Sequence, residues 1–108
     1  MSLSTHVLDA TAGGPATGVG VRLERRDSDG WVSVADGHTD SDGRISGWRP
    51  DSAGEYRLVF ATGEHYARRG IAAFHPEVTV SFRITDPGEH YHVPLLLGPY
   101  SYTTYRGS

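Results

Sequence analysis

The stretch Val78-Thr79-Val80-Ser81-Phe82-Arg83-Ile84 alternates apolar and polar side chains without interruption. Successive side chains on a β-strand point to opposite faces, so this period of two places the apolar residues on one face and predicts a half-buried strand. The same alternation recurs in three other segments, which are residues 19–24, 56–60 and 91–97. The chain is therefore predicted to be a series of short strands.

Residues that favour turns separate these segments. Asp, Gly and Pro supply the backbone angles that turns require. They cluster at residues 13–15, 27–30, 40–43, 53–54 and 86–88. One segment is typical of a helix, because Thr62 could cap a short stretch over 63–69 that ends at Gly70. The pattern predicts an all-β sandwich of two antiparallel sheets, with seven to eight strands and one short helix.

Length and composition exclude several classes of protein. The 108 residues match the size of one domain, so we expect residues 1–108 to form a single unit. A net charge of −3 offers no basic footprint for nucleic acid. All ten basic residues are arginine and there is no cysteine, which excludes lysine and thiol nucleophiles, disulfides and cysteine-based zinc sites. No apolar run approaches the roughly 20 residues of a membrane helix, and no secretory signal is visible. We expect a cytoplasmic protein with no membrane partner.

Three histidines lie in strand patterns and could carry chemistry. His6 lies in the strand pattern of residues 3–8, on the face opposite to the apolar set. His90 and His92 are two residues apart and therefore face the same way. Such a pair can bind zinc when a third ligand arrives from elsewhere, and His6 could supply it. A three-histidine metal site is thus one alternative, and solvent-exposed strand histidines are the other.

Arginine and tyrosine side chains add further candidates. Arg44 follows Asp42-Gly43 at a junction between turn and strand, where it is either solvated or a fixed fork for a carbonyl group. The stretch Tyr105-Arg106-Gly107-Ser108 gathers a phenol, a guanidinium and a glycine. Apolar residues 95–97 and the tyrosines near this tail exceed what a small monomer buries, which suggests a subunit interface.

Several blocks of sequence occur in an order that resembles the transthyretin-like 5-hydroxyisourate hydrolases along nearly the whole chain. These blocks are residues 3–9, 14–19, 39–44, 90–97 and 105–108. The resemblance implies a transthyretin-like β-sandwich that assembles as a homotetramer, a dimer of dimers with active sites at the dimer–dimer interface. It implies hydrolysis of 5-hydroxyisourate to 2-oxo-4-hydroxy-4-carboxy-5-ureidoimidazoline in urate degradation, by attack of water on a ring carbonyl. It implies no metal and no organic cofactor.

The family's functional residues map onto particular positions of this chain. The resemblance implies a catalytic set of His6, Arg44 and His92. It implies substrate binding by residues of this set and of the tail, namely His6, Arg44, Tyr105, Arg106, Gly107 and Ser108.

The chemistry of these residue types agrees with hydrolysis of a small, planar, carbonyl-rich substrate. Histidine has an unperturbed pKa of about 6.5, and a guanidinium can stabilise a developing oxyanion. We expect His92 and His6 to share water activation and proton delivery, Arg44 to bind the heterocycle, and Tyr105 with the terminal backbone to position it. Which histidine is the base stays open. The competing interpretation is a transthyretin-like binding protein without catalysis, which is expected to lack the polar trio and this tail. A structural sandwich domain is disfavoured by the same residues.

Overall fold

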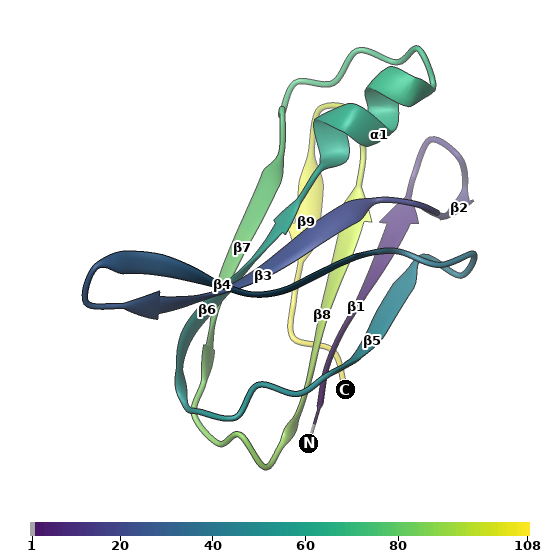
Figure 1. Cartoon of the computed structure of the whole chain (residues 1–108). Helices are drawn as coiled ribbons and strands as arrows, with labels where there is room; N and C mark the ends of the chain where they lie inside the picture. Colours follow the sequence, from purple (N-terminus) through teal and green to yellow (C-terminus); the bar gives the residue numbers. More distant parts are fainter. Residues whose placement is uncertain (1) are drawn as a thin grey trace.

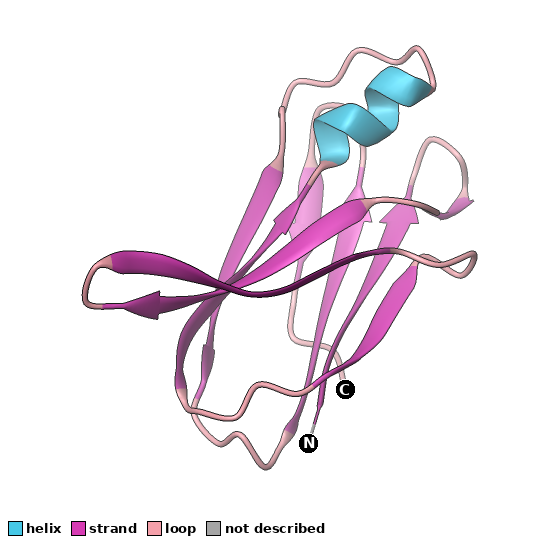
Figure 2. Ribbon diagram, viewed as in Figure 1, coloured by secondary structure: helices cyan, strands magenta, loops and turns pink. Residues whose placement is uncertain are grey.

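The computed structural model describes residues 2–108, in which two packed sheets carry one short helix at one end (Figures 1 and 2). The first sheet contains β1 (Ser2–Asp9), β2 (Gly14–Pro15), β5 (Arg44–Trp48), β8 (His90–Leu97) and β9 (Tyr102–Thr104). The second sheet contains β3 (Gly20–Asp27), β4 (Gly30–His38), β6 (Gly54–Phe60) and β7 (Val78–Ile84). The helix α1 (Thr62–Arg68) follows β6. The prediction of a two-sheet sandwich with one short helix is confirmed.

Two details of the predicted sandwich differ from the structure. Nine strands are assigned within residues 2–108 rather than seven to eight, because β2 and β9 are very short. The first sheet is not wholly antiparallel, since β1 and β8 pair in parallel along their full lengths. Parallel neighbours need a long connection, and here the whole second sheet lies in the chain between these two strands. Local alternation carries no information about that pairing.

β1 is the central strand that positions the site. β8 lies along one side of it, and on its other side β5 pairs with its first part and β2 with its end. Its burial alternates strictly, with Leu3, Thr5 and Val7 buried and the residues between them partly exposed. The prediction that His6 lies off the core face is therefore confirmed.

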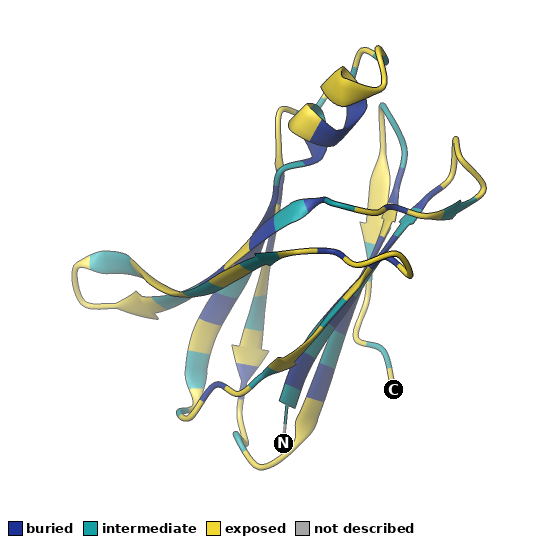
Figure 3. Ribbon diagram, turned by 45° about the vertical axis from the view of Figure 1, so that its right-hand side comes forward, coloured by how far each residue is buried: buried dark blue, intermediate teal, exposed yellow. Residues whose placement is uncertain are grey.

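Apolar side chains from both sheets form one buried core cluster, and Figure 3 shows that buried residues lie on strands of both sheets. Leu3 and Leu95 of the first sheet, with Leu58 and Phe60 of the second, are completely buried. At 25 cal/mol per Å² of apolar surface, full burial of one such side chain stabilises the fold by about 1.5–3 kcal/mol. The strand predicted from alternation at residues 78–84 is β7, and Val78 and Ile84 face this core.

The helix begins one residue earlier than the sequence predicts. Ala61 occupies the N-cap position and Thr62 is the first helical residue, so Thr62 does not cap. The carbonyl of Pro76 accepts a 3.1 Å hydrogen bond from the amide of Gly63, which removes one of the amides that a capping hydroxyl would serve. The predicted end is confirmed, because Gly70 adopts a φ of +68° just after the helix.

Of the helices in residues 2–108, none has the length and apolar character that a membrane span requires.

A buried carboxylate ties α1 to the end of β1. The Asp9 side chain accepts hydrogen bonds from Thr11 Oγ1 at 2.6 Å, His65 Nε2 at 2.9 Å, the Tyr66 hydroxyl at 3.1 Å and Arg69 at 2.6 Å. Burial raises the pKa of Asp9, but hydrogen bonds from Thr11, His65 and Tyr66 outweigh it and hold that pKa well below its ordinary value. Burial, together with the negative charge of Asp9, raises the pKa of Tyr66 to about 12. This cluster gives His65 a structural role that the sequence does not reveal.

Candidate functional site

The predicted catalytic residues meet on one face of the first sheet, the face turned away from the second sheet, which we call the outer face. His6 is directly opposite Arg44 in the pairing of β1 with β5. Ser4, two residues before His6, is directly opposite His92 in the pairing of β1 with β8. Residues directly opposite one another on neighbouring strands project to the same side. The fold therefore brings together on one face the His6, Arg44 and His92 that the family resemblance implies.

His92 is half-buried, and its ring is held by a neighbour on β1. Its Nδ1 lies 2.8 Å from the Ser4 hydroxyl oxygen. Desolvation by burial lowers the pKa of His92, and the positive charge of Arg44 lowers it further, with smaller contributions from His6 and His90. The ring is therefore neutral near pH 7 and able to accept a proton.

His90 has different surroundings from His92. Its side chain is exposed, and its Nδ1 lies 2.6 Å from the Ser2 hydroxyl oxygen. The two rings are nearly parallel, with centroids 6.5 Å apart. Among the described residues, no three side chains of histidine, aspartate or glutamate form a group that could hold a metal ion. The alternative of a three-histidine metal site has no support in this arrangement.

A tight turn delivers Arg44 to the site. The Asp40 carboxylate accepts hydrogen bonds from the amides of Asp42 at 2.8 Å and Arg44 at 3.0 Å. Gly43 has a φ of +75° and its carbonyl accepts a 2.8 Å hydrogen bond from the amide of Val7, which docks the turn on β1. The hydrogen bond from the Arg44 amide lowers the pKa of Asp40. The positive charge of Arg44 contributes to the same lowering, and within residues 2–108 the salt bridges do not involve its guanidinium.

The tail, residues 105–108, reaches the site through its backbone. The amide of Gly107 donates a 2.8 Å hydrogen bond to the carbonyl of His92. A Cβ atom at position 107 would lie only 2.5 Å from Cδ2 of His92, so glycine permits this approach. The side chains of Tyr105 and Ser108 are exposed.

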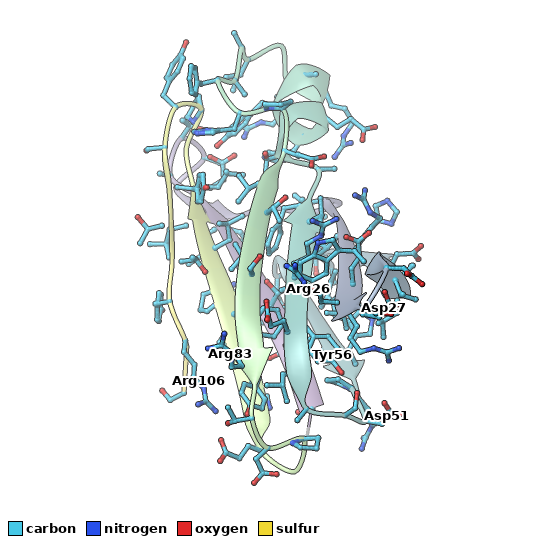
Figure 4. The ribbon with its side chains drawn as sticks, turned by 90° about the vertical axis from the view of Figure 1, so that its left-hand side faces the viewer. Arg26, Asp27, Asp51, Tyr56, Arg83 and Arg106 are labelled. Carbon is cyan, nitrogen blue, oxygen red and sulfur yellow. The ribbon has the colours of Figure 1, made fainter. Side chains whose placement is uncertain are left out.

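The Arg106 side chain is engaged away from His6 and Arg44. Its guanidinium donates hydrogen bonds to Glu89 at 3.0 Å and to the carbonyl of His90 at 3.2 Å, and it stacks over the Tyr91 ring at 4.4 Å. Figure 4 shows Arg106 beside Arg83 along one edge of the sandwich. A cleft of about 320 Å³ runs along this edge, and its lining includes Arg83, Tyr91, Tyr105 and Arg106. A direct contact between the Arg106 side chain and a ligand remains a prediction.

Ser4 is the member of the site that sequence reasoning missed. It lies within the strand pattern of residues 3–8, and its hydroxyl contacts the His92 ring. A signal was present, because residues two apart on a strand share a face and Ser4 is two residues from His6. That signal identifies the face but not the partner on β8.

Comparisons with known proteins find relatives of this chain along almost its whole length. A family model described as HIUase/Transthyretin family matches residues 3–107. The chain is 49% identical to the 5-hydroxyisourate hydrolase of Salmonella typhimurium, over 98% of this chain and 80% of the relative. The structure of Klebsiella pneumoniae 5-hydroxyisourate hydrolase superposes with a TM-score of 0.87 at 38% identity, covering 99% of this chain and 93% of the other. Transthyretin from Sparus aurata superposes with a TM-score of 0.91 at 35% identity, covering 97% and 95%.

Proposed function

The chain belongs to the HIUase/Transthyretin family, and we propose that the outer face of its first sheet is where it hydrolyses 5-hydroxyisourate. The substrate is a small molecule with ring carbonyls. The observation that carries this assignment is the meeting of His6, Arg44 and His92 on one face, with Gly107 seated against His92. A neutral imidazole, a guanidinium and a second imidazole can supply the base, the oxyanion donor and the acid for water attack on a carbonyl.

His92 is the general base in this proposal. Its lowered pKa keeps the ring neutral at the pH of the reaction. The contact with Ser4 occupies Nδ1 and leaves Nε2 to accept a proton from the attacking water. His6 lies opposite Arg44 on the neighbouring strand, and it would deliver a proton to the substrate nitrogen that leaves when the ring opens. Loss of such acid–base help costs roughly 10²- to 10⁴-fold in rate.

Arg44 binds the heterocycle and stabilises the oxyanion that forms at the attacked carbonyl. Its guanidinium keeps its charge at every relevant pH and presents a planar fork of donors. Arg44 lies opposite His6 and His92 lies opposite Ser4, two residues earlier on β1, so the two side chains flank β1 on the same face. Oxyanion donors contribute about 2.7–4 kcal/mol to catalysis when they are held in place before the reaction.

The tail forms one border of the site. We propose that Tyr105, Gly107 and Ser108 position the substrate beside His92. Arg106 contributes mainly through its backbone, because its guanidinium is bound to Glu89 and to the His90 carbonyl. In this arrangement Arg106 anchors the tail and Gly107 allows the tail to approach the ring.

A homotetramer, a dimer of dimers, would close the site. The outer face is open in a single chain, and its apolar end includes Leu8 and Leu96, which are opposite one another on β1 and β8. Leu96 is 41% exposed and borders a hollow of about 220 Å³ that Leu8 and Ala10 also line. Exposed apolar surface next to polar functional groups is typical of a subunit interface. A second copy seated there would exclude water from the polar end of the same face.

A transthyretin-like binding protein without catalysis is the second candidate, since transthyretin from Sparus aurata shares the fold. The polar outer face argues against it. A site for an apolar ligand needs apolar walls, whereas His6, Arg44 and His92 place a cation and two imidazoles together on this face.

The test is an ultraviolet time course on freshly generated 5-hydroxyisourate, with and without the protein. His92→Asn and His6→Asn are each expected to lower kcat/KM by at least ~10²-fold. His90→Asn is the matched control and is expected to cost far less, because His90 is exposed and bonded to Ser2. Equal losses at His90 and His92, or no loss at His6, would show that the site is wrongly drawn.

The proposed mechanism gives no step to a metal or an organic cofactor. Exhaustive dialysis against a strong chelator is therefore expected to leave the rate unchanged. Activity that is lost on chelation and restored by zinc would contradict the proposed roles of the histidines.

A further inference from the structure

Two serines of β1 face two histidines of β8 in matching pairs. Ser2 is opposite His90 and Ser4 is opposite His92 in the parallel register. The hydroxyl oxygen lies 2.6 Å from Nδ1 in the first pair and 2.8 Å in the second. Each imidazole of this strand therefore has one hydroxyl partner, and in both cases that partner is at Nδ1.

The two pairs are alike in chemistry and differ in surroundings. The pair of Ser2 and His90 is exposed, so water competes for both groups. The pair of Ser4 and His92 is partly buried. On its other side the His92 ring meets the tail, where a Cβ at Gly107 would collide with Cδ2. The His92 ring is thus confined between a hydroxyl and a backbone, which fixes its orientation.

A neutral imidazole can act as a base through only one of its nitrogens. If the proton is on Nδ1, Nε2 has the free lone pair, and the reverse tautomer leaves Nε2 as a donor. A hydroxyl can accept a hydrogen bond from Nδ1–H, so a serine oxygen beside Nδ1 can favour the tautomer with a basic Nε2. Without that oxygen, the ring could also rotate and exchange the places of Nδ1 and Cδ2.

We propose that Ser4 is a positioning residue for the hydrolysis, which keeps the proton of His92 on Nδ1 and directs Nε2 toward the attacking water. This inference rests on the proposed function of His92 as the base. Ser4 touches no reacting atom and acts through the His92 ring.

The charges around His92 are consistent with this role. Burial lowers the pKa of the ring most, followed by the positive charge of Arg44 and then by smaller electrostatic effects of His6 and His90. The Ser4 backbone has a smaller, opposite effect and raises that pKa, and this effect is separate from the contact of the Ser4 hydroxyl with the ring. The surroundings therefore favour a neutral ring, and its Nδ1 lies beside the Ser4 hydroxyl.

The test compares Ser4→Ala with Ser2→Ala, which removes the same atom from the same strand. Ser4→Ala is expected to lower kcat by about tenfold, the equivalent of one hydrogen bond, with little change in KM. Ser2→Ala is expected to keep the rate of the unaltered protein. Ser4→Thr keeps a hydroxyl and is expected to recover most of the lost rate. Nitrogen NMR of the histidine rings supplies a second readout. The Nδ1–H tautomer of His92 is expected to predominate in the unaltered protein and in Ser2→Ala, but not in Ser4→Ala.

Several outcomes would overturn the inference. One is an Nε2–H tautomer for His92 in the unaltered protein, a measurement that does not depend on whether Ser4→Ala folds. Another is equal losses in Ser2→Ala and Ser4→Ala, which would indicate a general effect on β1. If His92→Asn abolishes the rate while Ser4→Ala leaves it intact, the positioning role fails and the proposed function stands. If His92→Asn has no effect, the proposed function itself fails.

Discussion

The amide of Gly107 donates a 2.8 Å hydrogen bond to the carbonyl of His92, and a Cβ at position 107 would lie 2.5 Å from Cδ2 of the His92 ring. These residues are fifteen positions apart and form an isolated antiparallel bridge. The contact joins the tail to the proposed base. It also explains why the smallest residue occupies this position, since any side chain would push the tail or the ring aside.

Gly107→Ala is expected to lower kcat by roughly 10²-fold, because a shift of about 1 Å in a catalytic group can cost that much. The melting temperature is expected to change little, since Gly107 lies outside the core. Turnover of fresh 5-hydroxyisourate and thermal unfolding of the same preparation measure both quantities. Gly98→Ala is the matched control, because a Cβ there makes only an ordinary contact at 3.5 Å. A comparable loss in Gly98→Ala would point to general damage rather than to the contact with His92.

The acid limb of the pH–rate profile reports the His92 ring. Because the lowered pKa keeps the ring neutral and reactive, kcat/KM is expected to fall only below the ordinary histidine value of 6.5. Arg44→Gln removes a positive charge that disfavours protonation, so it raises the pKa of His92 and moves the acid limb to higher pH. The midpoint can be measured even though this variant is slower. Arg49→Gln, an exposed change just beyond β5, should leave the midpoint in place. An Arg44→Gln midpoint that stays fixed or moves to lower pH would contradict the assignment.

Asp9 is expected to control the stability of the fold and its response to acid. Asp9→Asn removes the charge that His65 and Arg69 face, and it should lower the free energy of unfolding by about 2 kcal/mol or more. The folded pKa of Asp9 lies below its unfolded value of 3.8, so this stabilisation is present above that value and is lost as the pH falls through the folded pKa.

Urea unfolding at about pH 7 and about pH 3 measures this effect, and the difference between Asp9→Asn and the unaltered protein should shrink at the lower pH. Asp27→Asn is the control. Asp27 is exposed, and its carboxylate accepts a hydrogen bond from the amide two residues later, as the Asp9 carboxylate does from the Thr11 amide. A difference that grows at low pH would be opposite in sign to the expectation.

Leu96→Glu tests the proposed assembly. A charge on the apolar end of the outer face is expected to dissociate the homotetramer and to reduce activity with it, because burying an unpaired charge at an interface is costly. Light scattering at micromolar concentration gives the mass, and turnover gives the activity. Val34→Glu is a close control, since Val34 on β4 is 42% exposed and Leu96 is 41% exposed. An unaltered protein that is monomeric, or a Leu96→Glu variant that stays tetrameric and fully active, would refute the shared site.

The sequence by itself determined five of the strands, β1, β3, β6, β7 and β8, and the face that most of their apolar residues bury. The alternation in Val78–Ile84 and around His6 predicts both, because the geometry of a strand is local and its period is two. Gly70 likewise marks the end of α1 through its own backbone conformation. The candidate set of His6, Arg44 and His92 came from the resemblance to a family, and local periodicity could assign only their faces.

Only the tertiary structure decided which of these residues meet. Ser4 and His92 are 88 positions apart, and Asp9 and His65 are 56 apart. The direction of the Arg106 guanidinium depends on Glu89, a residue of another segment. Such contacts follow from the order and register of the strands, which the packing of the whole sandwich selects and no local pattern records. The parallel pairing of β1 with β8 is the decisive instance, because it brings the Ser4 hydroxyl to the His92 ring.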